Sequence, residues 1–189
     1  MKEIFKNYSK NIFNQLSCLD LKKVFILEQL LYEAWKNNNK VFLCGNGGSA
    51  GNANHIANDL LYVINKKKGI NAESLVSNPA IITCLANDEG YENIFIKQLE
   101  TKAKKNDVLI VFSGSGNSKN IIKALRYSNK NKIKTVAIVG YDGGVAKKIA
   151  NLCIHTKVND MQVSEDFQTI IMHICAQLLK VRLNYFFKK

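Results

Sequence analysis

Residues 108–118 read VLIVFSGSGNS, an apolar run that passes directly into a loop of serines and glycines. β-Branched residues are frequent in the run, which is typical of a strand buried on both faces of a sheet. The same order of strand and glycine-rich loop occurs earlier, where residues 41–49 read VFLCGNGGS. Helix-like sequence follows each loop. Two such units predict a parallel sheet whose strands are joined by helical crossovers.

More strands and helices alternate on either side of these two units. Apolar runs predict further strands at residues 72–76, 135–139 and 152–156. Helical periodicity predicts the intervening helices at residues 48–63, 91–104, 117–128 and 143–150. Five strands with helical connections indicate an α/β fold, a doubly wound parallel sheet covered on both faces.

Helices occupy both ends of the chain. Apolar residues at helical spacing predict them at residues 2–17, 20–37 and 164–186. Asp20 is suited to cap the second helix. The 189 residues contain no linker-like stretch, so we expect one domain at 1–189, with a helical extension at 1–37 and an α/β core at 38–189.

The composition of the chain indicates its cellular compartment and the classes of partner that it can bind. No apolar run is long enough to span a membrane, and the N-terminus has no export signal. The five cysteines are an odd number without a C-x-x-C pair, which favours a reducing cytoplasm. The formal net charge is +12, yet the only arginines are Arg126 and Arg182, and the lysines are dispersed along the sequence. We therefore predict no nucleic-acid or membrane partner, and an anionic substrate that benefits from the positive field.

The two glycine-rich loops are candidate phosphate sites. Ligands of open parallel sheets bind beyond the carboxyl ends of the strands, where helix N-termini present free N–H groups. Serine hydroxyls add donors, and glycines let the backbone approach an anion. The predicted substrate-binding residues of the first loop are Asn46, Gly47 and Ser49. Those of the second loop are Ser113, Gly114, Ser115, Asn117 and Ser118.

Taken together, GNGGS and SGSGNS resemble the loops of the sugar isomerase (SIS) domain family. The longer strings NGGSAGNANHIAND, NDEGYENIF and EDFQTIIMH narrow the resemblance to its phosphoheptose isomerase branch. The resemblance implies a flavodoxin-like sheet, a homotetramer with active sites at subunit interfaces, and an aldose–ketose isomerase. The substrate implied is sedoheptulose 7-phosphate, which such enzymes convert to D-glycero-D-manno-heptose 7-phosphate. It also places Asp88 and Glu165 near the substrate.

A zinc or other divalent metal site is implied by the same resemblance. The family's ligand positions fall on His55, Asp59, Glu165 and His173, and its base and acid fall on Asp59 and His173. The departures from the family are Asp59 for glutamate, Glu165 for glutamine, Val63 for arginine, Gly114 for threonine and Asn52 for aspartate.

The residues themselves leave alternatives open. His55 and Asp59 are four apart on one predicted helix, so both can meet one ion, act as acid and base, or form a surface hydrogen bond. His173 lies among isoleucines, as a packed histidine also does. Asp88 is equally suited to cap a helix beginning near Tyr91. A non-catalytic regulator, binding a sugar phosphate or a protein such as a replication initiator, is the alternative to the enzyme.

Overall fold

One parallel sheet organises the molecule in the computed structural model, which describes residues 1–65 and 67–187. Its strands are β1 (Val41–Cys44), β2 (Ala72–Ser74), β3 (Val108–Ser113), β4 (Lys134–Val139) and β5 (Leu152–His155). They lie in the order β2-β1-β3-β4-β5, and every neighbouring pair is parallel. This is the flavodoxin-like order. The predicted fold class and all five predicted strands are confirmed, within two residues at each end.

Helices cover both faces of the sheet. They are α1 (Lys2–Ser17), α2 (Leu21–Lys36), α3 (Gly48–Asn58), α4 (Pro79–Asp88), α5 (Ile96–Lys102), α6 (Lys119–Lys130), α7 (Gly144–Ile149) and α8 (Met161–Phe186). A π-helical turn, η1 (Asp59–Val63), continues α3, and a 3-10 turn, η2 (Tyr91–Asn93), precedes α5. None of the helices in the described ranges is long and apolar enough to cross a membrane.

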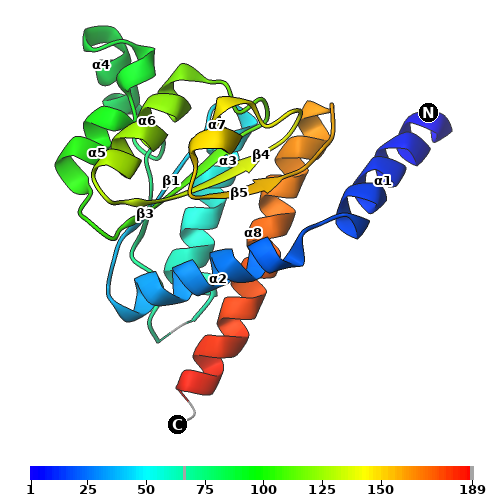
Figure 1. The fold of residues 1–189 in the computed structure, drawn as a ribbon, viewed down its shortest axis with the longest axis horizontal. Helices are drawn as coiled ribbons and strands as arrows, with labels where there is room; N and C mark the ends of the chain where they lie inside the picture. Colours follow the sequence, from blue (N-terminus) through cyan, green and yellow to red (C-terminus); the bar gives the residue numbers. More distant parts are fainter. Residues whose placement is uncertain (66, 188–189) are drawn as a thin grey trace.

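Alternation along the strands divides the interior into two cores. In β3, Ile110 and Phe112 face the core shared with α2, α3 and α8, while Leu109 and Val111 face the core under α5 and α6. All of these side chains are fully buried. Figure 1 shows α3 and α8 running side by side along the first face. Both helices begin at the carboxyl edge of the sheet, where a ligand is expected to bind.

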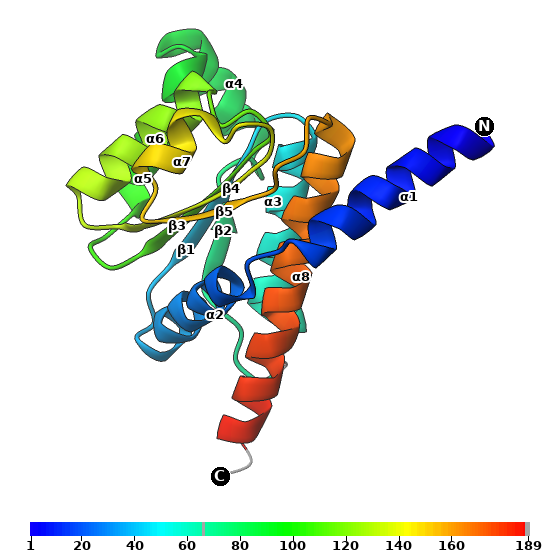
Figure 2. The same ribbon diagram turned by 45° about the vertical axis from the view of Figure 1, so that its right-hand side comes forward.

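The predicted extension at 1–37 consists of two helices with different environments. α2 packs into the first core, whereas α1 buries no residue and projects from the body (Figure 2). Tyr8 on α1 donates a hydrogen bond to Asp166, and Gln15 Nε2 donates to the carbonyl of Lys157 over 3.2 Å. The hydrogen bond to Asp166, with partial burial, raises the pKa of Tyr8 to about 12.

α4 is the one long helix that the sequence pattern did not predict. Asn78 caps it by accepting from the backbone N–H groups of Ala80 and Ile81, and Pro79 occupies its first position. Asp88 is its last residue, and the 3-10 turn at Tyr91 is preceded by Gly90 instead. The prediction that Asp88 caps a helix beginning near Tyr91 is therefore wrong, because α4 ends there.

Candidate functional site

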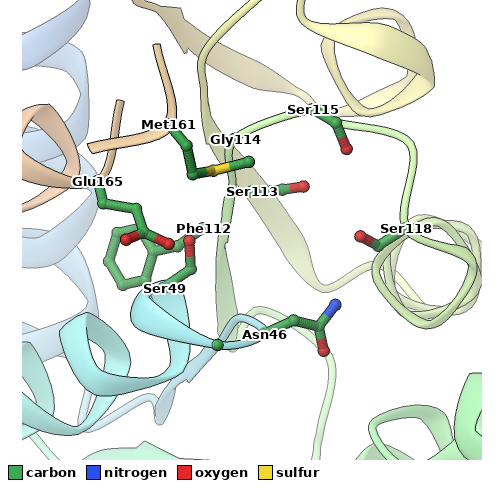
Figure 3. Close-up of a pocket in the computed structure, with 10 residues that line it drawn as sticks. Asn46, Ser49, Phe112, Ser113, Gly114, Ser115, Ser118, Met161 and Glu165 are labelled. Atoms are coloured by element: carbon green, nitrogen blue, oxygen red, sulfur yellow. The ribbon is translucent and has the colours of Figure 1, made fainter. Parts of the chain in front are cut away.

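A hollow of about 280 Å³ opens at the carboxyl ends of β1 and β3 (Figure 3). Its lining consists of Asn46, Gly47, Ser49, Phe112, Ser113, Gly114, Ser115, Ser118, Met161 and Glu165. Every predicted substrate-binding residue except Asp88 and Asn117 is among them. Sequence reasoning missed Phe112 and Met161. Phe112 directly precedes a predicted loop, a usable signal, whereas the position of Met161 depends on how α8 crosses the sheet edge.

Three serine hydroxyls converge on one side of the hollow. Figure 3 shows those of Ser113, Ser115 and Ser118 pointing toward a common space. Ser113 Oγ accepts from the Gly116 N–H at 3.0 Å, and Ser115 Oγ accepts from the Asn117 N–H at 3.2 Å. Each of these hydroxyls therefore keeps its hydrogen for a ligand. Within the described residues the Ser118 hydroxyl forms no hydrogen bond, so it also remains a donor.

The second loop is held in shape by its glycine and asparagine. Gly116 has φ of +67°, and a Cβ there would lie 2.1 Å from the carbonyl oxygen of Gly143. Asn117 Oδ1 accepts from the Val145 N–H at 3.1 Å, so this side chain fastens the loop to α7 and does not line the hollow. α6 begins immediately afterwards, and its N-terminus favours an anion. The loop is suited to hold a phosphate group.

Glu165 and Met161 form the opposite wall. A Cβ on Gly48 would lie 2.2 Å from a carboxylate oxygen of Glu165, so α8 and the start of α3 approach closely only because residue 48 is glycine. The Glu165 carboxylate makes no hydrogen bond or ion pair within the described residues. A Cβ on Gly114 would lie 2.6 Å from Met161 Sδ, so the methionine occupies the space that a threonine would need. Glycine at position 114, where the family has threonine, thus leaves room for the Met161 side chain.

Asn46 and Asp88 differ in how they relate to the hollow. The amides of Asn46 and Asn120 exchange two hydrogen bonds, of 2.8 and 3.0 Å, and the Tyr91 hydroxyl donates to Asn46 Oδ1 at 2.9 Å. Asn46 is therefore fixed in place. Asp88 is exposed on α4, where hydrogen bonds from Asn87 and Cys84 lower the pKa of its carboxyl group. The structure does not bring Asp88 to the hollow.

His55, Asp59 and His173 form a second cluster, on neighbouring faces of α3, η1 and α8. His55 Nε2 lies 2.9 Å from His173 Nε2, and Asp59 Oδ2 lies 3.6 Å from His55 Nε2 and 3.3 Å from His173 Nε2. Two ligand atoms bound to zinc at about 2.0–2.1 Å and the tetrahedral angle lie roughly 3.3 Å apart. The three residues therefore have donor atoms and spacings that fit one divalent ion.

Glu165 does not join this cluster within one chain. It is eight residues before His173 on α8, and eight residues of α-helix rise about 12 Å. Its carboxylate lines the hollow instead, while none of the three clustered residues does. Two departures from the family remain, Asn52 and Val63. Asn52 Nδ2 donates to the Glu165 carbonyl at 2.9 Å, and the Val63 side chain lies outside the described residues.

Comparison with known proteins identifies the family. A family model described as SIS domain matches residues 5–140. The chain belongs to the SIS domain family. Among SIS-domain relatives, the phosphoheptose isomerase of Helicobacter pylori (strain Shi470) is 37% identical over 153 residues, covering 80% of this chain and 79% of the relative. That of Geotalea daltonii is 35% identical over 162 residues, covering 85% and 84%. Within the family, the chain falls in the phosphoheptose isomerase branch.

A solved structure agrees with the SIS-domain architecture. The phosphoheptose isomerase from Francisella tularensis superimposes with a TM-score of 0.88 over 95% of each chain, at 23% identity. At that identity the likeness concerns the fold. It extends over 95% of the chain, so it concerns the whole architecture and not one part of the sheet.

Proposed function

We propose that this SIS-domain protein is a cytoplasmic aldose–ketose isomerase that converts sedoheptulose 7-phosphate to D-glycero-D-manno-heptose 7-phosphate through an enediol. The observation that carries the proposal is the convergence of the Ser113, Ser115 and Ser118 hydroxyls at a helix N-terminus. Relatives named phosphoheptose isomerase, at about one third identity over most of the chain, support the choice of sugar.

The reaction moves a proton between adjacent carbons, so it needs a base at the carbon and an acid at the carbonyl oxygen. Asp59 Oδ2 and His173 Nε2, 3.3 Å apart, are suited to these two roles. Asp59 removes the proton from C1 of the open-chain ketose, and His173 protonates the oxygen on C2. The enediol then collapses to the aldose: a proton is delivered to C2, and the hydroxyl on C1 gives up its proton to become the aldehyde oxygen. The serine hydroxyls bind the phosphate, and this remote binding energy orients the reacting carbons.

We further propose that His55, Asp59 and His173 hold a zinc ion. With His173 Nε2 and Asp59 Oδ2 on the metal, the ion would replace His173 at the carbonyl oxygen, and Asp59 would act as the base through Oδ1. Zinc, when bound, polarises the carbonyl oxygen of the substrate. The 2.9–3.6 Å triangle of ligand atoms supports this assignment. The exposure of the His55 and His173 side chains, 49% and 43%, leaves room for a fourth ligand from outside the chain.

We propose that the active site is completed between subunits of a tetramer. The hollow and the zinc cluster lie about two helical turns apart along α3, because Ser49 precedes His55 by six residues. Several large apolar side chains of α1 and α2 are exposed, including Ile4, Phe5, Phe13 and Phe25. These surfaces support an assembly in which the hollow of one subunit faces the cluster of a neighbour.

The direct test is incubation of zinc-loaded protein with sedoheptulose 7-phosphate, followed by NMR of the anomeric protons. Appearance of the heptose 7-phosphate is expected. Calorimetry with the same sugar separates the alternative, because a regulator would bind the sugar phosphate and leave it unchanged. If the protein neither binds nor converts the sugar phosphate, both the isomerase role and the sugar-phosphate regulator role are overturned.

A further inference from the structure

Two lysine-bearing loops lie side by side at the amino ends of the strands, the sheet edge opposite the serine hollow (Figure 1). They are residues 103–107, between α5 and β3, and residues 130–134, from the last residue of α6 to the first of β4. The Asn106 N–H donates to the Lys132 carbonyl at 3.0 Å, and the Lys134 N–H donates to the Asp107 carbonyl at 2.8 Å. Lysines that are dispersed along the sequence therefore meet in the fold.

The lysines of these loops outnumber their acidic residues five to one. Their lysines are Lys104, Lys105, Lys130, Lys132 and Lys134. Asp107 is their one acidic residue, and its carboxylate accepts the backbone N–H groups of Lys40 and Lys104, each at 2.8 Å. Within the described residues, none of the five lysines forms an ion pair. A site for an anion is what such a cluster provides.

The loops enclose a hollow of about 340 Å³, called here the basic hollow. Its polar lining consists of Lys105, Asn106, Asn129, Lys132, Lys134 and Asn151. Asn151 is fixed because its Oδ1 accepts from the Thr135 N–H at 2.9 Å, and within residues 1–65 and 67–187 its side-chain Nδ2 has no hydrogen-bond acceptor. Three ammonium groups and an oriented amide match the oxygens of a phosphate group.

A second hollow, of about 600 Å³, adjoins the basic hollow and shares Asn106 and Lys134 with it. Leu30, Ala34 and Val108 give it apolar walls. Its acidic residue, Glu33, accepts hydrogen bonds from Gln29 at 3.0 Å and Asn37 at 3.5 Å. The two hollows together present a phosphate site beside a mixed apolar and polar compartment.

We propose that this amino-edge site binds an organic phosphate, with its phosphate groups among Lys105, Lys132 and Lys134 and its body in the adjoining hollow. A nucleoside diphosphate has this combination of two charged phosphates and a flat, partly apolar body. The proposal is independent of the isomerase activity, since the site lies at the other edge of the sheet.

The experiment is calorimetric titration of the full-length protein with ADP. In the Lys132→Gln/Lys134→Gln variant, the dissociation constant should rise roughly tenfold, because two charge-assisted contacts are lost. A charge-matched control, Lys22→Gln/Lys23→Gln on α2, should bind as the unmutated protein does. So should Ser115→Ala/Ser118→Ala, which alters only the serine hollow.

Each contrary result would overturn the site. An equal loss of ADP affinity in the Lys22/Lys23 control would mean that ADP is attracted diffusely to a basic surface. Loss in the serine variant would mean that ADP occupies the serine hollow. No binding at millimolar ADP, or unchanged binding in the Lys132/Lys134 variant, would also exclude it. A circular dichroism spectrum and a Tm equal to those of the unmutated protein serve as the check that the Lys132/Lys134 variant folds.

Discussion

The serine hollow and the His55–Asp59–His173 cluster are built in different ways, although α3 and α8 contribute to both. The hollow is recessed at the carboxyl edge of the sheet, where Ser49 and Ser113 are only 3% and 6% exposed. The cluster lies on the outer surfaces of its helices, with nearly half of each histidine side chain exposed. One chain thus completes the proposed phosphate site, whereas the proposed acid–base pair of Asp59 and His173 lacks walls that exclude water. A second subunit is the simplest supplier of those walls.

The largest expected effect is a loss of turnover on substitution of Asp59, which distinguishes the cluster from the serine hollow. Asp59→Asn keeps the size of the side chain but removes the base, so kcat should fall roughly 10²–10⁴-fold. Binding of the sugar phosphate should change little, because Asp59 does not line the hollow. Steady-state kinetics with calorimetry measures both. A large loss of affinity with kcat retained would assign the cluster to binding.

The converse variant tests the hollow. Ser115→Ala/Ser118→Ala should weaken sugar-phosphate binding by about 1–3 kcal/mol through lost hydrogen bonds to a charged group. Ser17→Ala, which removes an exposed hydroxyl bonded to the Phe13 carbonyl, is the matched control. Unchanged calorimetric affinity in the double variant would place the phosphate elsewhere.

Metal removal probes the cluster alone. If zinc is present at a hundred times its dissociation constant, it adds roughly 2.7 kcal/mol to the free energy of unfolding. Chelation should therefore lower Tm by about 5–10 °C. His55→Ala should show the lower Tm with or without chelator, because it removes one ligand. A Tm of the unmutated protein that responds neither to chelator nor to added zinc would exclude the metal.

A smaller effect concerns the wall opposite the serines. Glu165→Gln removes a negative charge from the hollow, so inorganic phosphate should bind about two- to fivefold more tightly. Glu100→Gln, on the exposed side of α5, controls for net charge. Weaker phosphate binding in Glu165→Gln would mean that the carboxylate organises the hollow and does not merely repel the anion.

Sequence reasoning predicted the sheet because β-branched runs and glycine-rich loops are local signals. It also predicted most of the hollow, because the carboxyl ends of parallel strands must meet at one edge. α4 was missed although Asn78 and Pro79 carry the signal of a capped helix start. Met161 was missed because its contact with Gly114 arises only when α8 packs against the second loop.

The cluster was only partly predictable. The spacing of His55 and Asp59 on one helix anticipated their contact, and the resemblance added His173. Glu165 was assigned to the same ion, yet its eight-residue separation from His173 already implies about 12 Å on one helix. A ligand set taken from a family does not say which subunit supplies each residue. That information resides in the assembly.

Mixing two impaired variants tests the shared active site most directly. Ser115→Ala/Ser118→Ala supplies an intact cluster, and His173→Ala supplies an intact hollow. Co-refolded in equal amounts and assayed at a sugar-phosphate concentration well below the dissociation constant of the serine variant, they should recover about a quarter of the unmutated rate, because random assembly pairs the two intact halves in that share of interface sites. Each variant refolded alone should fall well below that rate under the same conditions. No recovered activity, from mixtures that light scattering shows to be tetramers, would contradict a site built between subunits.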